Sequence, residues 1–316
     1  MSSPILPIGD NDMSEYVRTL GGTKATKPLA DFMLTNQGLG KSFYVDSVTG
    51  SNSRNGRTPQ TAVATLDYAV GLCTANKGDV IYCLPGHTET KEASGDIATI
   101  DVAGITIVGI GEGASIRPTF NLGHASATMT VSAANVKISG LRFVSTVADV
   151  AVGLTLTATS DNSIIEDCQF RDTAADAELL VAISVAAAAH GVKIRNNDFK
   201  TTAAAGSNNA ILCAAVTDLL VSGNTAYGKY ATGAMLTSGV LTRAVITDNI
   251  FVNAEAAIAI ALNGTTSTGV LARNLLGGTT SIAAALTGDN AMWCFENYIS
   301  GAAAVSGVLN PAADAD

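Results

Sequence analysis

The side chains best suited to acid–base chemistry are carboxylates in the middle of the chain. Glu166 and Asp167 are adjacent, and Asp198 follows further along. Two carboxylates placed on either side of a glycosidic bond can hydrolyse it, one as a general acid and the other as a base or nucleophile. If the protein is an enzyme, we therefore expect Glu166, Asp167 and Asp198 to be its catalytic residues.

The same carboxylates have a simpler explanation as turn residues. Asp is common in turns because its side chain hydrogen-bonds to nearby backbone, and Asp248 and Glu296 occupy similar places later in the chain. An eliminating enzyme would instead need a calcium cluster with an Arg or Lys base. No Ser-His-Asp set is visible, and the five cysteines have no metal-ligand spacing. The sequence therefore predicts a protein that is not an enzyme and that has no metal and no cofactor.

The elements that carry these residues come from a repeat that begins after residue 100. Its phrase is an apolar alternation that ends in a polar turn, as in residues 192–199 (VKIRNNDF) and 219–226 (LLVSGNTA). The separations along one aligned column are 27, 29, 27, 25, 25 and 23 residues. A recurrence of this size predicts a solenoid. The column consists of Leu141, Cys168, Asn197, Asn224, Asn249, Asn274 and Asn297.

Each repeat is predicted to contain at least two short strands. Val192 and Ile194 alternate with polar residues, which indicates a strand with one buried face. A second apolar alternation follows each phrase, as in residues 181–185 (VAISV). An Asn in the turn can bond the backbone, and Asn side chains stacked one coil apart can bond each other. We therefore expect a structural ladder formed by Asn197, Asn224, Asn249, Asn274 and Asn297.

Two solenoid folds match this pattern. Residues 216–224 fit the leucine-rich-repeat pattern Leu-x-x-Leu-x-Leu-x-x-Asn. That fold needs a helical segment on its convex side, whereas the second half of each repeat here alternates Ala, Thr, Val and Ile, which favours strands. We predict an all-β protein with a right-handed, single-stranded parallel β-helix, and the leucine-rich solenoid is the alternative.

Small residues are abundant and charged residues are few. Charged residues make up 14% of the chain and the net charge is −9; no basic cluster is visible along the sequence, which argues against nucleic-acid binding. The first residues lack the regions of a signal peptide, and no apolar run is long enough to span a membrane. The cysteines are typical of small buried residues in a reducing compartment. We expect a protein that is made in a cytoplasm, is not exported by the Sec pathway and has no membrane partner.

We expect three segments: an N-terminal arm over residues 1–40, a cap over 41–95 and the β-helix over 96–316. Thr58 as N-cap and Pro59 at the first helical position predict a helix over about 60–76, which would cover the first coil. The arm is apolar but irregular, so it is expected to bind a capsid or a neighbouring subunit, or else to pack along its own rod. Its candidate binding residues are Ile5, Leu6, Ile8, Tyr16, Phe32 and Met33.

Several segments of the cap resemble a known family. The sequences FYVD (43–46), GDVIY (78–82) and PGHTE (85–89) resemble the first part of pectate-lyase-like right-handed β-helices. They are especially similar to those in structural proteins of tailed bacteriophages. The phrase Val-x-Ile-x-x-Asn-x-Phe resembles the coils of the same superfamily. Residues 189–191 (AHG) are similar to the Gly-His-Gly of β-helix polygalacturonases, but the first Gly is Ala and the paired-Asp motif is absent.

The resemblance implies a non-enzymatic structural protein of a tailed phage, which decorates or cements a capsid or forms an appendage. Its location would be the virion, after synthesis in the host cytoplasm. Its partners would be the major capsid protein or other virion subunits, and it would associate as a homotrimer. The alternative is a glycan-degrading enzyme of the phage-tailspike type, a hydrolase or a lyase on the same fold.

Overall fold

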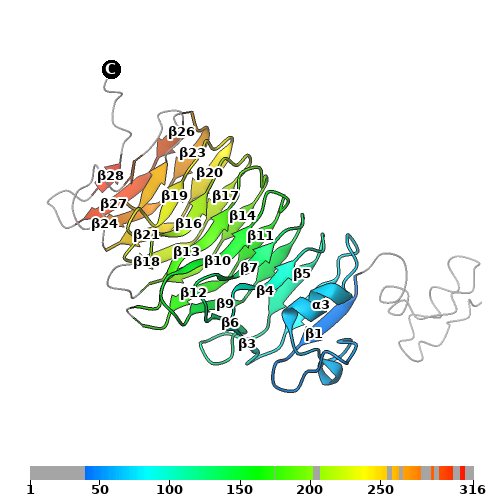
Figure 1. Ribbon diagram of the computed structural model, residues 1–316. Coiled ribbons are helices and arrows are strands. Elements are labelled where there is room, and N and C mark those ends of the chain that lie inside the picture. The colour runs from blue at the N-terminus through cyan, green and yellow to red at the C-terminus, as the bar shows by residue number, and fades with distance from the viewer. Residues whose placement is uncertain are drawn as a thin grey trace, which may run out of the picture.

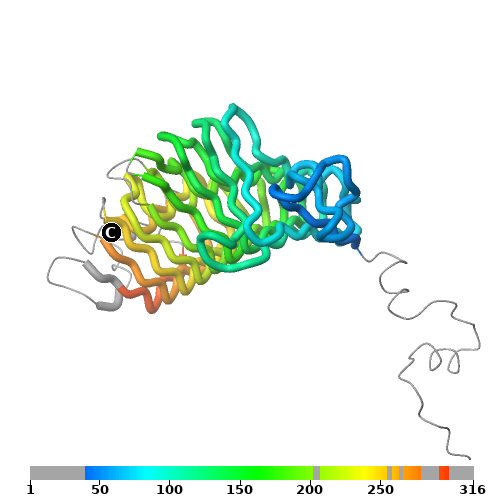
Figure 2. Tube along the Cα trace, turned by 90° about the horizontal axis from the view of Figure 1, so that it is seen from below, coloured from blue at the N-terminus to red at the C-terminus, as the bar shows by residue number. Residues whose placement is uncertain are grey.

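The structure is a computed structural model that describes residues 40–174, 176–201, 207–254, 258–262, 266–278, 286–287, 292–301 and 307–309. Within these residues the chain winds into a parallel β-helix (Figure 1). Its coils stack along one axis, with the N-terminal cap at one end (Figure 2). The predicted fold class is confirmed: the protein is an all-β solenoid. None of the described helices is long and apolar enough to cross a membrane.

Three long sheets run the length of the rod, here named sheets A, B and C, and each coil contributes one strand to each sheet in that order. Sheet A contains β1 (Ser42–Val45), β2 (Val80–Cys83), β5 (Thr106–Gly109), β8 (Lys137–Ser139), β11 (Ile164–Glu166), β14 (Lys193–Arg195), β17 (Leu220–Ser222), β20 (Ala244–Thr247), β23 (Gly269–Ala272) and β26 (Met292–Phe295).

Sheet B follows sheet A after a short corner. It contains β3 (Thr88–Lys91), β6 (Thr119–Leu122), β9 (Arg142–Ser145), β12 (Gln169–Asp172), β15 (Asp198–Lys200), β18 (Thr225–Gly228), β21 (Ile250–Asn253), β24 (Leu275–Gly278), β27 (Asn297–Gly301) and β28 (Gly307–Leu309), which pairs antiparallel with β27.

Sheet C closes each coil. It contains β4 (Gly95–Ile100), β7 (Ala127–Val131), β10 (Val150–Leu156), β13 (Leu179–Val185), β16 (Asn209–Cys213), β19 (Met235–Thr237), β22 (Ile260–Leu262) and β25 (Leu286–Thr287). Each complete coil thus has three strands. The repeated phrase spans two of them, because the corner between sheets A and B is too short to interrupt the phrase.

The core consists of residues that point inward at the same position in successive coils. Phe143, Phe170 and Phe199 are in register in sheet B. Their rings stack with centroids 4.9 Å apart at both steps. Alternate residues of each strand point outward, so the strands separate an apolar interior from a polar exterior. This alternation leaves the outward residues available to form a site.

The cap differs in detail from the predicted helix over 60–76. Thr58 does cap a helix with Pro59 at its start, but this 3₁₀ helix, η1, ends after Pro59–Thr61. Val63 then forms a bridge with Val45 of β1, which interrupts the helix. A second helix, α3 (Leu66–Leu72), begins after a new N-cap at Thr65 and packs its buried face on β4.

Candidate active site

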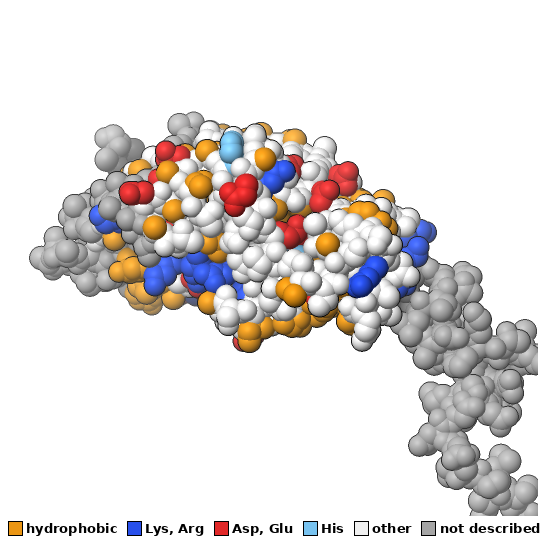
Figure 3. All heavy atoms as spheres, turned by 60° about the horizontal axis from the view of Figure 1, so that its bottom comes forward, with side chains coloured by type: hydrophobic (Ala, Val, Ile, Leu, Met, Phe, Trp, Pro, Cys, Tyr) orange, Lys and Arg blue, Asp and Glu red, His pale blue; other side chains and the backbone are white. Residues whose placement is uncertain are grey.

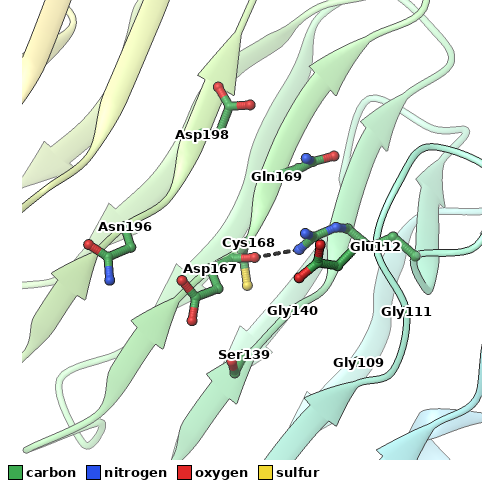
Figure 4. A pocket seen from close by; sticks show the side chains of 11 residues that line it. Gly109, Gly111, Glu112, Ser139, Gly140, Asp167, Cys168, Gln169, Asn196 and Asp198 are labelled. Carbon is green, nitrogen blue, oxygen red and sulfur yellow. Dashed lines mark hydrogen bonds between the residues drawn. The ribbon is translucent and has the colours of Figure 1, made fainter.

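A cleft lies at the corner where sheet A turns into sheet B, and consecutive coils contribute to it (Figure 4). Its volume is about 400 Å³. The connection between β5 and β6, residues 110–118, is longer than the corner of the following coils and forms one side. Glycines and polar side chains line the cleft: Gly109, Gly111, Glu112, Arg117, Ser139, Gly140, Asp167, Cys168, Gln169, Asn196 and Asp198.

The backbone of each corner determines which side chains face the cleft. Gly140, Asp167 and Asn196 are left-handed, with φ of 75°, 54° and 55°. This conformation is accessible to Gly and is adopted by Asp and Asn more readily than by most other residues. The residues that follow Asp167 and Asn196, which are Cys168 and Asn197, are buried. Asp167 and Asn196 therefore remain outside, where they line the cleft.

Glu166 lies next to this cleft but is held by two basic side chains. Its Oε1 is 2.5 Å from Nζ of Lys137, and its Oε2 accepts a 2.6 Å hydrogen bond from Nε of Arg195. Burial acts to raise the pKa of Glu166, but the hydrogen bonds from Lys137 and Arg195 hold the pKa below its ordinary value. A carboxylate in this position links three neighbouring coils and is not suited to donate a proton.

Asp198 lines the cleft and is also paired. Its carboxylate accepts a hydrogen bond from Nη2 of Arg171, and its backbone carbonyl accepts one from Nη1 of the same residue at 2.7 Å. The structure therefore brings Asp167 and Asp198 to one cleft but gives them different surroundings. Of the three predicted catalytic carboxylates, Asp167 is the one whose side chain has no hydrogen bond or ion pair in the described part of the chain.

Sequence reasoning did not find two residues of the cleft, Glu112 and Arg117. Both belong to the connection before β6, which lies before Leu141, the first residue of the aligned column. Nη1 of Arg117 donates a 2.5 Å hydrogen bond to the backbone carbonyl of Asp167, across 50 residues of sequence. Glu112 extends from the same connection toward Asp167 (Figure 4). The glycines at 109, 111 and 113 were the available signal, because they mark an irregular connection at the edge of a strand.

The groups that could bind a metal do not converge. In the described segments no three His, Cys, Asp or Glu side chains could hold a metal ion. Nδ1 of His87, His124 and His190 each accepts a backbone N–H, from Ser47, Ser126 and Thr217. The ring proton is then on Nε2, so neither nitrogen offers a free lone pair.

The buried cysteines are equally unsuited to metal binding. Burial raises the pKa of the Cys168 and Cys213 thiols to about 12. The thiolate is the form that binds metals, so these two side chains behave as small apolar core residues. The predicted contact residues of the N-terminal arm, from Ile5 to Met33, lie outside the described residues.

Two solved structures resemble the chain. One is titled "Rhamnogalacturonan lyase"; it is 13% identical, the match covers 82% of this chain and 87% of that chain, and the TM-score is 0.40. The other is the GH136 lacto-N-biosidase from Eubacterium ramulus, at 10% identity, with 82% and 68% coverage and a TM-score of 0.38. The prediction that the protein is not an enzyme is not retained, because both titles name enzymes. A likeness at these identities and TM-scores transfers no activity to this chain. No curated protein matches the chain.

The sequence also matches one described family. Residues 91–307, which include most of the solenoid, match the family "Periplasmic copper-binding protein (NosD)". The predicted location in a virion is therefore wrong, since this family is described as periplasmic. The match covers more than half of the chain, and the chain belongs to the NosD family.

Proposed function

We propose that the protein is a glycan-cleaving enzyme of the periplasm and that its site is the cleft beside Asp167. The observation that supports this most directly is that Glu112 and Asp167, from connections far apart in sequence, line one cleft of about 400 Å³. Gln169 and Asn196 line it too, and such amides bind sugar hydroxyls as donors and acceptors. We assign the substrate as a carbohydrate on the basis of this lining.

The chemistry assigned to the site is hydrolysis of a glycosidic bond. One of the two carboxyl groups, Glu112 or Asp167, protonates the leaving oxygen as the carbon–oxygen bond breaks. The other carboxylate takes a proton from the water whose oxygen forms the new bond to the anomeric carbon. The proton lost by the acid is thus matched by the proton gained by the base. Apart from this water and the substrate, the step uses only side chains of the chain itself.

Arg117, Arg171 and Asp198 are positioning residues in this proposal. Arg117 fixes the corner at Asp167 through its hydrogen bond to the backbone carbonyl. Arg171 holds Asp198, whose backbone is part of the same sheet. Glu166 has a structural role between Lys137 and Arg195. In this proposal Glu112 is a catalytic carboxylate, in place of Glu166, which the sequence predicts.

Copper binding, which the family description names, is not part of the proposal. Copper prefers imidazole and sulfur ligands. The described residues contain all three histidines and all five cysteines of the chain. The histidine nitrogens are engaged as described above, and no three His, Cys, Asp or Glu side chains come together within these residues. These donors do not fit a copper site. A capsid role is not retained either, because it would require the virion location.

The test is a cleavage assay with the purified full chain on a panel of neutral and acidic polysaccharides, measured by the release of reducing ends. Glu112→Gln and Asp167→Asn are expected to lower the rate at least about 100-fold. Asp248→Asn is the matched control for Asp167→Asn: Asp248 is left-handed at the same corner position, with φ of 58°, and pairs with Arg273 outside the cleft. The proposal fails if no polysaccharide is cleaved or if Asp167→Asn and Asp248→Asn retain equal rates.

A further inference from the structure

Three arginines from consecutive coils lie together on the outer face of sheet B, beside the cleft. Arg117 precedes β6, Arg142 opens β9 and Arg171 lies in β12. Arg142 is in register with Gln169, which in turn is in register with Asp198. Arg142 is therefore the strand neighbour of Gln169, which lines the cleft. Figure 3 shows several Lys and Arg side chains close together at one place on the face of the rod in view, with others scattered over the same face.

The three guanidinium groups are close enough to repel one another. Burial is the main cause that lowers the pKa of Arg142, and the charges of Arg171 and Arg117 lower it further. Like charges gathered at a partly buried position are unfavourable unless an opposite charge is added. Arg171 has such a partner in Asp198. Arg117 and Arg142 have no carboxylate partner in the described residues.

The hydrogen bonds of Arg117 and Arg142 are incomplete. Each uses Nη1 to bind a backbone carbonyl, of Asp167 at 2.5 Å and of Ala114 at 2.9 Å. The Nε atoms of both side chains are buried and have no acceptor. Buried donors without acceptors are rare in folded proteins. These Nε atoms are enclosed, and Nη2 of each guanidinium group also makes no hydrogen bond within the described residues. Two guanidinium groups without a carboxylate beside the cleft favour a ligand that carries negative charge.

We propose that Arg117 and Arg142, supported by Arg171, bind an oxyanion substituent of the ligand that occupies the cleft. Guanidinium groups bind the planar carboxylate and the tetrahedral sulfate with paired hydrogen bonds. The group is thus the carboxylate of a uronic acid or a sulfate ester on a sugar. The proposed function supplies the assumption that the ligand is a glycan; the oxyanion contact itself does not depend on cleavage.

A polyanion with a charge on every unit, such as a nucleic acid, does not fit the same surface. Glu112, Asp167 and Asp198 line the cleft next to the arginines, and the chain carries a net charge of −9. Closely spaced negative charges would meet these carboxylates. A glycan with one anionic substituent fits better: the substituent would meet the arginines, and the uncharged sugar hydroxyls would meet the polar side chains of the cleft.

The experiment measures binding of three probes to the full chain: glucuronate, glucose 6-sulfate and glucose, by ligand-observed NMR at low and high salt. Glucuronate or the sulfate ester is expected to bind at least about tenfold more tightly than glucose, and this preference should weaken with salt. The stronger of the two identifies the substituent as carboxylate or sulfate. Equal binding of all three probes would overturn the proposal.

Variants locate the site. Arg142→Gln and Arg117→Gln are expected to remove the preference for the anionic probe. Arg243→Gln removes the same charge from an exposed side chain that is paired with Asp218, and it should keep the preference. Thermal unfolding curves of the variants establish that each is folded. If Arg142→Gln does not fold, the probe preference of Arg117→Gln alone tests the assignment. Loss of the preference in Arg243→Gln, or its retention in both cluster variants, would contradict the assignment.

The two proposals can fail separately. Binding of an anionic probe that depends on Arg142, without cleavage of any polysaccharide, would refute the proposed hydrolysis and leave the oxyanion site in place. Cleavage that depends on Asp167 but shows no preference for anionic glycans would refute the oxyanion site and leave the proposed hydrolysis in place.

Discussion

Asn224 donates a hydrogen bond from its side-chain Nδ2 to Oδ1 of Asn249, one coil further along, at 3.0 Å. The backbone N–H of Asn224 donates to the same oxygen at 3.0 Å, and its Nδ2 also donates to the carbonyl of Ile194 at 2.8 Å. The arrangement recurs from Asn197 to Asn297 and forms a ladder inside the corner. Each buried amide is thereby satisfied by its neighbours, which fixes both the corner and the register of the coils.

The first prediction concerns an interior step of this ladder. Asn249→Ala leaves the N–H groups of Asn224 and the carbonyl of Val221 without their partners. We expect a loss of roughly 3–5 kcal/mol in the free energy of unfolding, because several buried polar groups lose their hydrogen bonds together. Chemical denaturation measures it. Asn208→Ala, at an Asn outside the ladder column, is the control and should cost less than about 1 kcal/mol.

The second prediction extends the ladder. Cys168 occupies the column one coil before Asn197, and its backbone N–H already donates to Oδ1 of Asn197 at 3.0 Å. By analogy with Asn197, an amide here would donate to Asn197 and to the carbonyl of Ile138. Cys168→Asn is therefore expected to be neutral or to stabilise the fold by up to about 1 kcal/mol, as measured by denaturation. A loss of more than about 2 kcal/mol would show that the corner before Asn197 cannot hold an amide.

The third prediction concerns acid stability at Glu166. Its folded-state pKa lies below the ordinary value of 4.5, so the unfolded chain binds a proton more readily than the folded one in this range. The stabilisation by Glu166 is fully present above about pH 4.5 and is lost as the pH falls through the folded-state pKa. The stability difference between wild type and Glu166→Gln should thus shrink between pH 6 and pH 3, as followed by thermal unfolding. A pH-independent difference would contradict the ion-pair assignment.

The fourth prediction has the opposite sign and concerns Glu178. Its side chain is buried, and its Oε2 has no hydrogen-bond partner. Burial raises its pKa above the ordinary 4.5, and Asp149 and Asp172 add to the effect. The folded protein therefore binds the proton more tightly than the unfolded chain, and stability falls as the pH rises from 4.5 through the folded-state pKa. Glu178→Gln should stabilise the protein at pH 7 by about 1 kcal/mol and give no gain below pH 4.5.

The same unfolding experiment includes its own check. Glu296→Gln removes a carboxylate at an exposed corner, so it should not reproduce the pH-dependent gain. If Glu178→Gln is less stable than the wild type at pH 7, the prediction is wrong, and the ionised carboxylate makes a stabilising contact that Gln cannot make.

The solenoid could be predicted because its information is periodic. Asn197 and Asn224 share one column of the aligned repeat, and Phe143 and Phe170 share another. Residues in the same column lie next to each other in successive coils, so each column predicts a set of contacts. The same column logic extends to Glu166 and Arg195, which both lie two places before the column residue and are one coil apart. The repeat therefore places these two oppositely charged side chains next to each other.

Other features could not be obtained in this way. Glu112 and Arg117 belong to a connection without a counterpart in later coils, so no alignment of the repeat places them near Asp167. The break of the predicted helix at Val63 depends on a bridge to Val45, which is a tertiary contact. The sequence predicts at least two strands per coil, and the structure has three. The third is hidden in the sequence because the corner at the ladder is short enough to look like the continuation of one strand.

The alternation along each strand separates two kinds of change. In β12 the inward Phe170 stacks with its neighbours, whereas the outward Gln169 and Arg171 face the cleft and the arginine cluster. Replacing outward residues leaves the stacked interior intact, and the coils advance by about 4.8 Å each. Moving a few outward residues to the equivalent positions of the next coil would therefore shift a binding position along the rod by one coil spacing. The inward residues that stabilise the fold would stay unchanged.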